Sequence, residues 1–154
     1  MSLEEYKKKR NFTSTAEPEG KQESTQKSIY VIQQHDASRL HWDLRLEIGV
    51  VLKSWALPKV PPTDPQTRRL AVETEDHPID YADFEGTIPQ GQYGAGKVTI
   101  WDRGTFKTIE SEEDKLIIDI NGQKLKGPYV LIRTRFAGSK KNWLFFKKKT
   151  EIIS

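Results

Sequence analysis

The chain has 154 residues, the size of one domain with a hydrophobic core of its own. Its 25 lysines and arginines against 22 acidic residues give a formal net charge of +3, which permits a polyanionic partner without requiring one. The absence of cysteine excludes a disulfide scaffold, a thiolate metal site and a cysteine nucleophile. No apolar run reaches the roughly 18 residues of a membrane span and the start lacks a secretory signal, so we expect a cytoplasmic protein without membrane contact.

The first 27 residues are too polar to form a core. Eleven of them are charged and five are apolar, so burial of this segment cannot offset the entropy lost on ordering it. We therefore predict a polar, partly flexible N-terminal arm over residues 1–27 and a folded domain over residues 28–154. Phe12 and the Glu17-Pro18 pair are candidates for holding the arm against that domain.

Short runs with a period of two residues begin after the arm and are separated by turns rich in glycine and proline, a pattern typical of half-buried strands. The expected strands are residues 28–35, 40–48, 51–57, 68–75, 97–102, 116–120, 128–135 and 142–148. No window of ten residues has a helical apolar stripe, so helices should be limited to one or two turns near 78–83 and 110–115. The sequence thus predicts a mainly all-β fold, a closed or nearly closed barrel of about eight strands, with a two-sheet sandwich as the alternative.

Residues 40–48 carry the most informative pattern. Because side chains alternate along a strand, one face of this segment is apolar and suits a core. The other face carries an imidazole, two carboxylates and a guanidinium, from His41, Asp43, Arg45 and Glu47. This face is either a solvated surface with cross-strand ion pairs or a functional site. Two of the three histidines in one short segment, next to aspartate, favour a site.

His35 adds a possible third ligand to this face. It shares a strand face with Gln33, and the loop between the two strands can bring it beside His41. Two imidazoles and one carboxylate, from His35, His41 and Asp43, form a facial triad that suits Mn²⁺, Fe²⁺ or Zn²⁺ and leaves positions open for water and substrate. The absence of cysteine favours the harder metals.

The third histidine also lies among carboxylates at the end of a strand. Glu73, Glu75 and His77 share one face, and Pro78 ends the strand. Alone, this would be an ordinary acidic strand end. Together with the other two histidines, it places every imidazole of the chain beside a carboxylate.

Two further motifs have simpler explanations. Residues 91–98 (GQYGAGKV) nearly match a phosphate-binding P-loop, but Val98 lacks the hydroxyl for Mg²⁺ and a strand follows, so we expect a tight turn with its backbone close to another group. Residues 140–149 mix lysines with aromatics, which predicts a final strand whose lysines protect a sheet edge. A nucleic-acid surface is the alternative there, supported by Arg133 and Arg135.

Four segments, in this order, resemble one known family. They are HDASRLHWDLRLE from residue 35, VLKSWALPK from residue 51, EDHPIDYADFEGTIPQGQYGAG from residue 75 and VTIWDRGT from residue 98. Over about residues 10–148 the chain is similar to the 3′-phosphoesterase module of bacterial DNA ligase D, of which stand-alone archaeal and bacterial versions close to this length exist.

This resemblance implies a β-barrel with its active site in a crescent groove. It also implies a Mn²⁺-dependent enzyme, with other divalent transition metals as alternatives, that acts on the 3′ ends of DNA or RNA–DNA primer–templates. Such an enzyme removes a terminal ribonucleoside to leave a 3′-phosphate, and then removes the phosphate to leave a 3′-hydroxyl. Ligation and polymerisation would be the work of a separate DNA ligase and polymerase.

The resemblance also implies roles for particular residues. The family's metal ligands match His35, His41 and Asp43, while Arg45 matches the arginine that grips the phosphate and His77 the histidine beside it. Other positions that the family uses at or around the site match Tyr81, Lys59, Arg69, Gln33 and Glu75. Positions for the ribonucleoside step match Arg10 and Glu17, and Asn11 stands where the family usually has aspartate.

Two rival functions remain at this point. The first is a non-catalytic nucleic-acid-binding barrel, accessory to a DNA ligase, in which the cluster is only an ion network. The second is a metal-dependent oxygenase, because a two-histidine, one-carboxylate triad also serves iron. Arg45, two residues beyond Asp43, favours a phosphate ligand over the oxygenase. No serine lies beside a base, so direct hydrolysis is favoured over a covalent intermediate.

Overall fold

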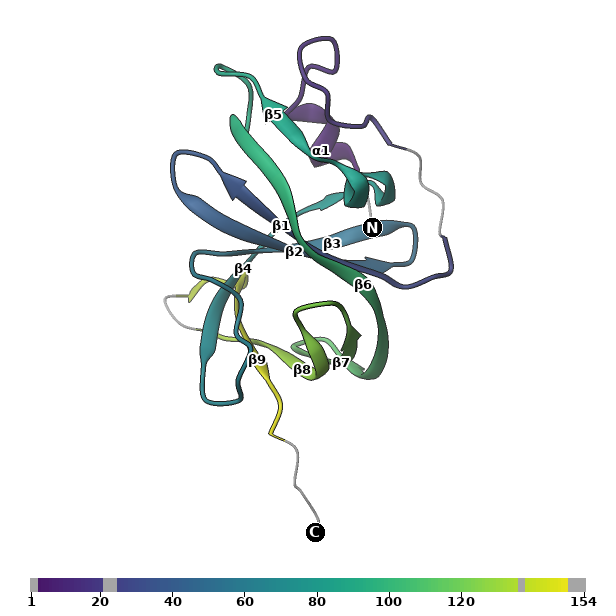
Figure 1. Ribbon diagram of the computed structural model, residues 1–154, viewed down its shortest axis with the longest axis vertical. Coiled ribbons are helices and arrows are strands. Elements are labelled where there is room, and N and C mark those ends of the chain that lie inside the picture. Colours follow the sequence, from purple (N-terminus) through teal and green to yellow (C-terminus); the bar gives the residue numbers. More distant parts are fainter. Residues whose placement is uncertain (1–2, 21–24, 136–137, 150–154) are drawn as a thin grey trace.

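The computed structural model describes residues 3–20, 25–135 and 138–149. Within these ranges most of the chain forms strands, joined by short turns (Figure 1). In chain order the elements are α1 (Glu4–Lys8), β1 (Ile29–Asp36), β2 (Leu40–Ile48), β3 (Val51–Leu57), β4 (Arg68–His77), the 3₁₀ helix η1 (Ile79–Asp83), β5 (Gly86–Ile88), β6 (Gly96–Glu112), β7 (Lys115–Asn121), β8 (Lys126–Arg133) and β9 (Asn142–Lys147).

Eight of these strands close into an antiparallel barrel. Their order is β1-β2-β3-β4-β9-β8-β7-β6, and pairing between β1 and β6 closes the ring. The short strand β5 pairs with β6 as an addition to the barrel. The predicted barrel is therefore confirmed, and the sandwich alternative is wrong, because closure leaves no open edge between two sheets.

Two local predictions are wrong. Residues 110–115 do not form a helix, because β6 runs to Glu112 and a two-residue turn leads straight into β7. Strand β9 is not a sheet edge, because it pairs with β4 on one side and β8 on the other. The predicted helix near 78–83 is confirmed as the single-turn helix η1.

Apolar side chains at alternate strand positions fill the barrel. Tyr30 and Ile32 of β1 and Leu44 and Leu46 of β2 are fully buried in this core, together with side chains from the other barrel strands. The residues between them point to the outer face of the barrel. The side chains that interest us, on β1 and β2, therefore lie outside the main core and need a second cover.

That cover is a second apolar cluster on the outer face of β1. Val31 packs there with Tyr81 of η1, Ile88 of β5 and Tyr6 of α1. Figure 1 shows the arm, in purple, at the end of the molecule away from β7 and β8. The composition of the arm predicts a segment without a buried core residue, but its Tyr6 has no exposed surface. Neither described helix has the length and apolar character needed to cross a membrane.

Candidate active site

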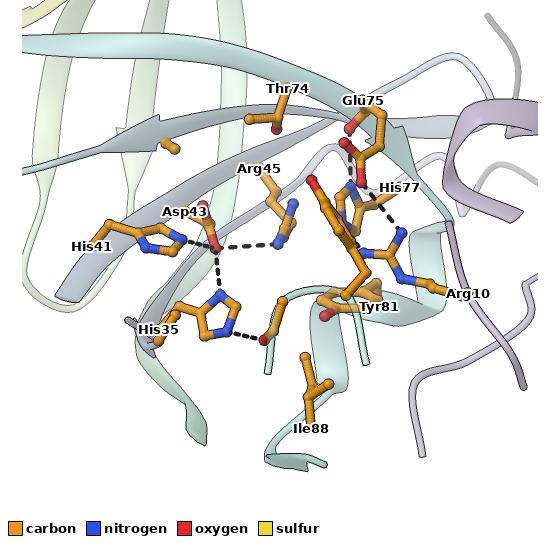
Figure 2. Close-up of a pocket in the computed structure, with 14 residues that line it drawn as sticks. Arg10, His35, His41, Asp43, Arg45, Thr74, Glu75, His77, Tyr81 and Ile88 are labelled. Carbon is orange, nitrogen blue, oxygen red and sulfur yellow. Dashed lines mark hydrogen bonds and ion pairs between the residues drawn. The ribbon is translucent and has the colours of Figure 1, made fainter. Parts of the chain in front are cut away.

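The pairing of β1 with β2 brings both histidines of the predicted triad together. His35 stands opposite His41 in the antiparallel register, and Gln33 stands opposite Asp43. Asp43 Oδ2 lies 3.2 Å from His41 Nε2 and 3.7 Å from His35 Nδ1. One ligand atom from each of the three side chains falls within 4.8 Å of the others. Figure 2 shows the two rings pointing at the same carboxylate.

Backbone carbonyls fix the orientation of both rings. Nε2 of His35 donates its hydrogen to the carbonyl of Gly94 at 2.6 Å, and Nδ1 of His41 donates to the carbonyl of Arg39 at 3.1 Å. Since each ring uses one nitrogen as a donor, Nδ1 of His35 and Nε2 of His41 face Asp43. Metal-binding histidines are held in this way by their second nitrogen. The donor set and its orientation fit a divalent transition metal ion.

The charge of Asp43 is stabilised although the side chain is buried. Burial alone would raise the pKa of Asp43, but the Arg45 guanidinium and the two imidazoles outweigh burial and hold that pKa well below its usual range. Burial also acts to lower the pKa of His41, yet its contact with Asp43 gives a net rise. The carboxylate is therefore ionised and ready to act as a ligand.

Arg45 lies beside this cluster and is held on three of its nitrogens. Nε donates to Gln33 Oε1 at 2.6 Å, Nη1 donates to Ser54 Oγ at 2.9 Å, and Nη2 lies 3.5 Å from Asp43 Oδ2. Its guanidinium also lies over the ring of Tyr81. A guanidinium has five N–H groups, so these three contacts leave two for a ligand. An anion in the pocket would meet a preoriented fork.

The N-terminal arm supplies a second arginine to the same pocket. Arg10 Nε donates to Glu17 at 2.9 Å, Nη1 donates to Glu75 at 3.2 Å, and Nη2 lies 3.4 Å from His77 Nε2. Glu17 in turn accepts a hydrogen bond from the Tyr81 hydroxyl at 2.7 Å. These contacts connect the arm to β4 and η1.

His77 is buried as a neutral imidazole. Burial lowers the pKa of His77 well below its ordinary value, and the guanidiniums of Arg45 and Arg10 lower it further. Nδ1 donates to the backbone carbonyl of Glu75 at 2.9 Å, which leaves Nε2 as the acceptor facing Arg10. Burial likewise raises the pKa of the Tyr81 hydroxyl well above its usual value, so this group is a donor.

A pocket of about 210 Å³ joins these groups (Figure 2). Its lining includes most of the residues that the sequence predicts for the site: Arg10, His35, His41, Asp43, Arg45, Glu75, His77 and Tyr81. Cationic and metal-ligating groups thus converge on one small space, a combination that suits an anion such as phosphate.

Other predicted site residues lie outside that pocket. Gln33 is fully buried behind Arg45 and holds it in place, while Glu17 does the same for Arg10 and Tyr81. Asn11 is exposed and accepts hydrogen bonds from Thr13. Lys59 and Arg69 line a separate hollow of about 230 Å³. The part that each predicted site residue plays in the reaction, in the pocket or outside it, stays a prediction.

The sequence reasoning does not single out two residues that position this site. Ser54 stands opposite Arg45 on β3 and holds its guanidinium, and only its place on the predicted strand 51–57 hints at this. Gly94 orients His35 with its carbonyl, in a left-handed conformation with φ of +75°. The glycine-rich turn is the signal here, because it predicts backbone close to another group.

Comparison with known proteins identifies the family. Residues 33–133, well over half of the chain, match the model of the DNA ligase D 3′-phosphoesterase domain. The chain belongs to this family. It is 50% identical to the multifunctional non-homologous end joining protein LigD of Pseudomonas aeruginosa, over 96% of this chain and 18% of that protein. The resemblance inferred from four sequence segments is thereby confirmed.

Other relatives have the same relationship to this chain. It is 45% identical to the LigD protein of Mycobacterium tuberculosis strain H37Rv, over 86% of the chain and 18% of that protein. It is 41% identical to LigD of Mycolicibacterium smegmatis, over 97% of the chain and 21% of that protein. The chain spans about a fifth of the length of the curated relatives it matches.

Proposed function

We propose that this chain is a metal-dependent phosphoesterase that repairs the 3′ ends of DNA and of RNA–DNA primer–templates. It first removes a 3′-terminal ribonucleoside to leave a 3′-phosphate, and then removes that phosphate to leave a 3′-hydroxyl. The single observation that carries this proposal is the meeting of the His35–His41–Asp43 cluster with the free edge of Arg45 in one pocket.

His35, His41 and Asp43 would hold the metal, with Mn²⁺ as the expected ion. When bound, such an ion supplies Lewis acidity toward a phosphoryl oxygen and lowers the pKa of a coordinated water. Arg45 binds the non-bridging oxygens of the phosphate with the two N–H groups that its protein contacts leave unused. Gln33 and Ser54 keep this guanidinium in position throughout the reaction.

His77 acts as the general acid that protonates the leaving oxygen. In the free protein its Nε2 is unprotonated, because burial and two guanidiniums oppose a positive charge there. A bound phosphate brings negative charge that offsets Arg45 and Arg10, and so favours protonation of Nε2. The complex takes up this proton from water, and Nε2 then donates it to the oxygen that leaves phosphorus. Tyr81, with its hydroxyl fixed on Glu17, keeps the imidazole and Arg45 apart from bulk water.

The arm positions the larger of the two substrates. Arg10, Glu17 and Glu75 form one network at the pocket, and Asn11 follows Arg10 directly. A diester carries an extra nucleoside that must be oriented, whereas a phosphate monoester needs only the groups around the metal site. Positioning groups of this kind act through orientation of the reacting atoms.

The biological setting follows from the relatives. They are named multifunctional non-homologous end joining proteins. We assign the same DNA repair setting to this chain, as the end-processing step. The barrel and its arm account for the described residues, so ligation and polymerisation at these ends belong to a DNA ligase and a polymerase outside this stretch of chain.

The test uses two primer–templates, one ending in a single ribonucleotide and one ending in a 3′-phosphate. With Mn²⁺ the protein should convert both to a 3′-hydroxyl, and excess EDTA should stop both reactions. If neither end is changed while the protein still binds the duplex, it is a nucleic-acid-binding barrel and the enzymatic proposal is wrong. A Ser54→Ala variant should lose activity in part, since Arg45 then lacks one of its three supports.

A further inference from the structure

We propose that the hollow next to the active-site pocket is a subsite for the leaving ribonucleoside, with Tyr93 as the surface on which its base stacks. This inference rests on the proposed function and extends it. We call this space the second hollow, and define it by Lys9, Glu73, Glu75, Tyr93, Arg133 and Lys141, with their neighbours completing the lining.

The second hollow adjoins the pocket that holds the reacting phosphate. It has a volume of about 460 Å³, against about 210 Å³ for the pocket. Thr74, Glu75 and Tyr93 line both spaces, so the two meet along β4 and the 91–96 turn. A group attached to a phosphate in the pocket would therefore have room in the larger space.

Tyr93 has the properties of a stacking surface. Half of its surface is exposed, and among the described residues it is the one aromatic side chain with such exposure. Lys9 holds it from the arm, with Nζ 3.4 Å from the hydroxyl and 4.8 Å from the ring centre. The carbonyl of the next residue, Gly94, is hydrogen-bonded to His35, so the backbone that carries Tyr93 is held close to the metal-type cluster. Exposed aromatics held in this way bind nucleobases by their flat faces.

The charges of the second hollow fit a neutral nucleoside better than a chain of phosphates. Lys9, Arg133, Lys140 and Lys141 contribute positive charge, and Glu5, Glu73 and Glu75 contribute negative charge. Glu75 is bound by Lys9 and Arg10, and Glu73 by Lys53 and the Trp143 indole. Hydrogen-bond donors and acceptors thus both line the space that Tyr93 borders. A ribonucleoside offers hydroxyl donors and base acceptors to match them, and four cations against three carboxylates give the hollow little net charge to attract a phosphate backbone.

The first step, removal of the terminal ribonucleoside, is the step in which this subsite would be occupied. Water adds to phosphorus, the bond from phosphorus to the 5′ oxygen of the terminal ribonucleoside breaks, and that oxygen takes a proton. The products are a 3′-phosphate on the primer and a neutral, free ribonucleoside. The second step breaks the bond from phosphorus to the 3′ oxygen of the primer and releases inorganic phosphate, so no nucleoside lies beyond the phosphate. Tyr93 should therefore matter for the first step far more than for the second.

The test compares Tyr93→Ala with Tyr93→Phe on the two primer–templates. The alanine variant should lose about tenfold or more in kcat/KM for ribonucleoside removal relative to phosphate removal, with much of the loss in KM, because a stacked base is lost. The phenylalanine variant keeps the ring and should stay close to the unaltered protein. Ile109→Ala removes another exposed side chain, outside both spaces, and should change neither rate. Equal losses on both substrates, or no loss on the ribonucleotide end, would overturn the subsite.

A binding measurement tests stacking without turnover. The primer carries a fluorescent 2-aminopurine ribonucleotide at its 3′ end, and EDTA is present throughout. Its fluorescence should stay quenched on the unaltered and Tyr93→Phe proteins and rise on Tyr93→Ala, because the base loses its stacking partner. Identical fluorescence on all three proteins would overturn the subsite. If the unaltered protein acts on neither primer, the proposed function fails, and this readout decides the subsite alone.

Discussion

The contacts of Arg45 require a guanidinium group and not merely a positive charge. Three contacts orient the guanidinium plane, and two N–H groups remain for the substrate. Arg45→Lys keeps the positive charge but cannot make the contacts to Gln33, Ser54 and a phosphate together. We expect activity on both substrates to fall by about 10²-fold, as for the loss of a transition-state donor. Steady-state kinetics with both primer ends measures this.

A matched substitution controls for the general effect of exchanging arginine for lysine. Arg103 forms an exposed ion pair with Asp83, and Arg103→Lys should leave activity within about twofold, since exposed pairs contribute little. Near-normal turnover of Arg45→Lys would mean that Arg45 serves only as a structural partner of Asp43.

His77 makes the stability of the fold depend on pH. Burial and the guanidiniums of Arg45 and Arg10 hold its pKa well below the value of about 6.5 in an unfolded chain. Below pH 6.5 the unfolded state therefore binds a proton that the folded state does not, and stability falls as pH falls. Each pH unit below 6.5 should cost about 1.4 kcal/mol through this residue. Urea unfolding of the unaltered protein and His77→Gln at pH 7 and pH 5 measures it.

The His77→Gln variant controls for all other titrating groups, because each of them is still present in it. His77→Gln should lose less stability than the unaltered protein between the two pH values. A parallel fall in both proteins would show that folding does not lower the pKa of His77.

Single strands are the elements that the sequence predicts best. The alternation along residues 40–48 places Asp43 and Arg45 on one face by local geometry alone, and the structure has them there. Where a contact joins distant segments, the sequence carries no comparable signal. The support of Arg45 by Ser54 depends on the β2–β3 register, and the arm's Tyr6 finds its partners on η1 and β4. From composition alone, Tyr6 is one apolar residue in a polar segment, and its burial cannot be predicted.

The arm should be fastened to the barrel mainly by Tyr6. Its ring is fully buried against Phe12, His77 and Tyr81, and its hydroxyl donates to the carbonyl of Pro18. Tyr6→Ala should lower the free energy of unfolding by about 3 kcal/mol, because a large buried ring is lost. Urea unfolding at pH 7 gives this value. The same variant should slow ribonucleoside removal more than phosphate removal, since Arg10 loses its place.

Tyr6→Phe separates the ring from its hydroxyl. It loses one hydrogen bond and should cost about 1 kcal/mol, with the arm still in place. If Tyr6→Ala unfolds at the same urea concentration as the unaltered protein, the arm contributes nothing to the fold and acts as an independent segment.

In the barrel as a whole, the main hydrophobic core and the candidate active site lie in different places. The main core lies inside the ring of strands, while the metal-type cluster lies on the outer face and shares a pocket with Tyr81 and Ile88 of the second apolar cluster. Closure of that ring joins residues 29–36 to residues 97–105, and no pattern in the sequence specifies which strands meet. The strand count and turn spacing favour a barrel, but only the long-range register brings the 91–96 turn against His35.

This separation predicts that the protein stays folded when its metal is removed. Asp43 is balanced by Arg45 and two imidazoles in the absence of any ion, so it is not left as an uncompensated buried charge. EDTA should abolish activity and leave the far-ultraviolet circular dichroism spectrum unchanged. Added Mn²⁺, at 100 times its dissociation constant, should raise the free energy of unfolding by about 2.7 kcal/mol. Urea unfolding with and without Mn²⁺ measures this increment.

Two histidine variants locate the ion that produces this increment. His41→Ala removes one of three ligands and should lose both the Mn²⁺ increment and activity, because the remaining pair binds a labile ion too weakly. His77→Gln also removes an imidazole from the pocket but not from the cluster, so it should keep the increment while losing activity. A full increment in His41→Ala would place the ion elsewhere on the barrel. An apoprotein that is already unfolded in EDTA would mean that the metal, and not the two apolar clusters, holds the outer face together.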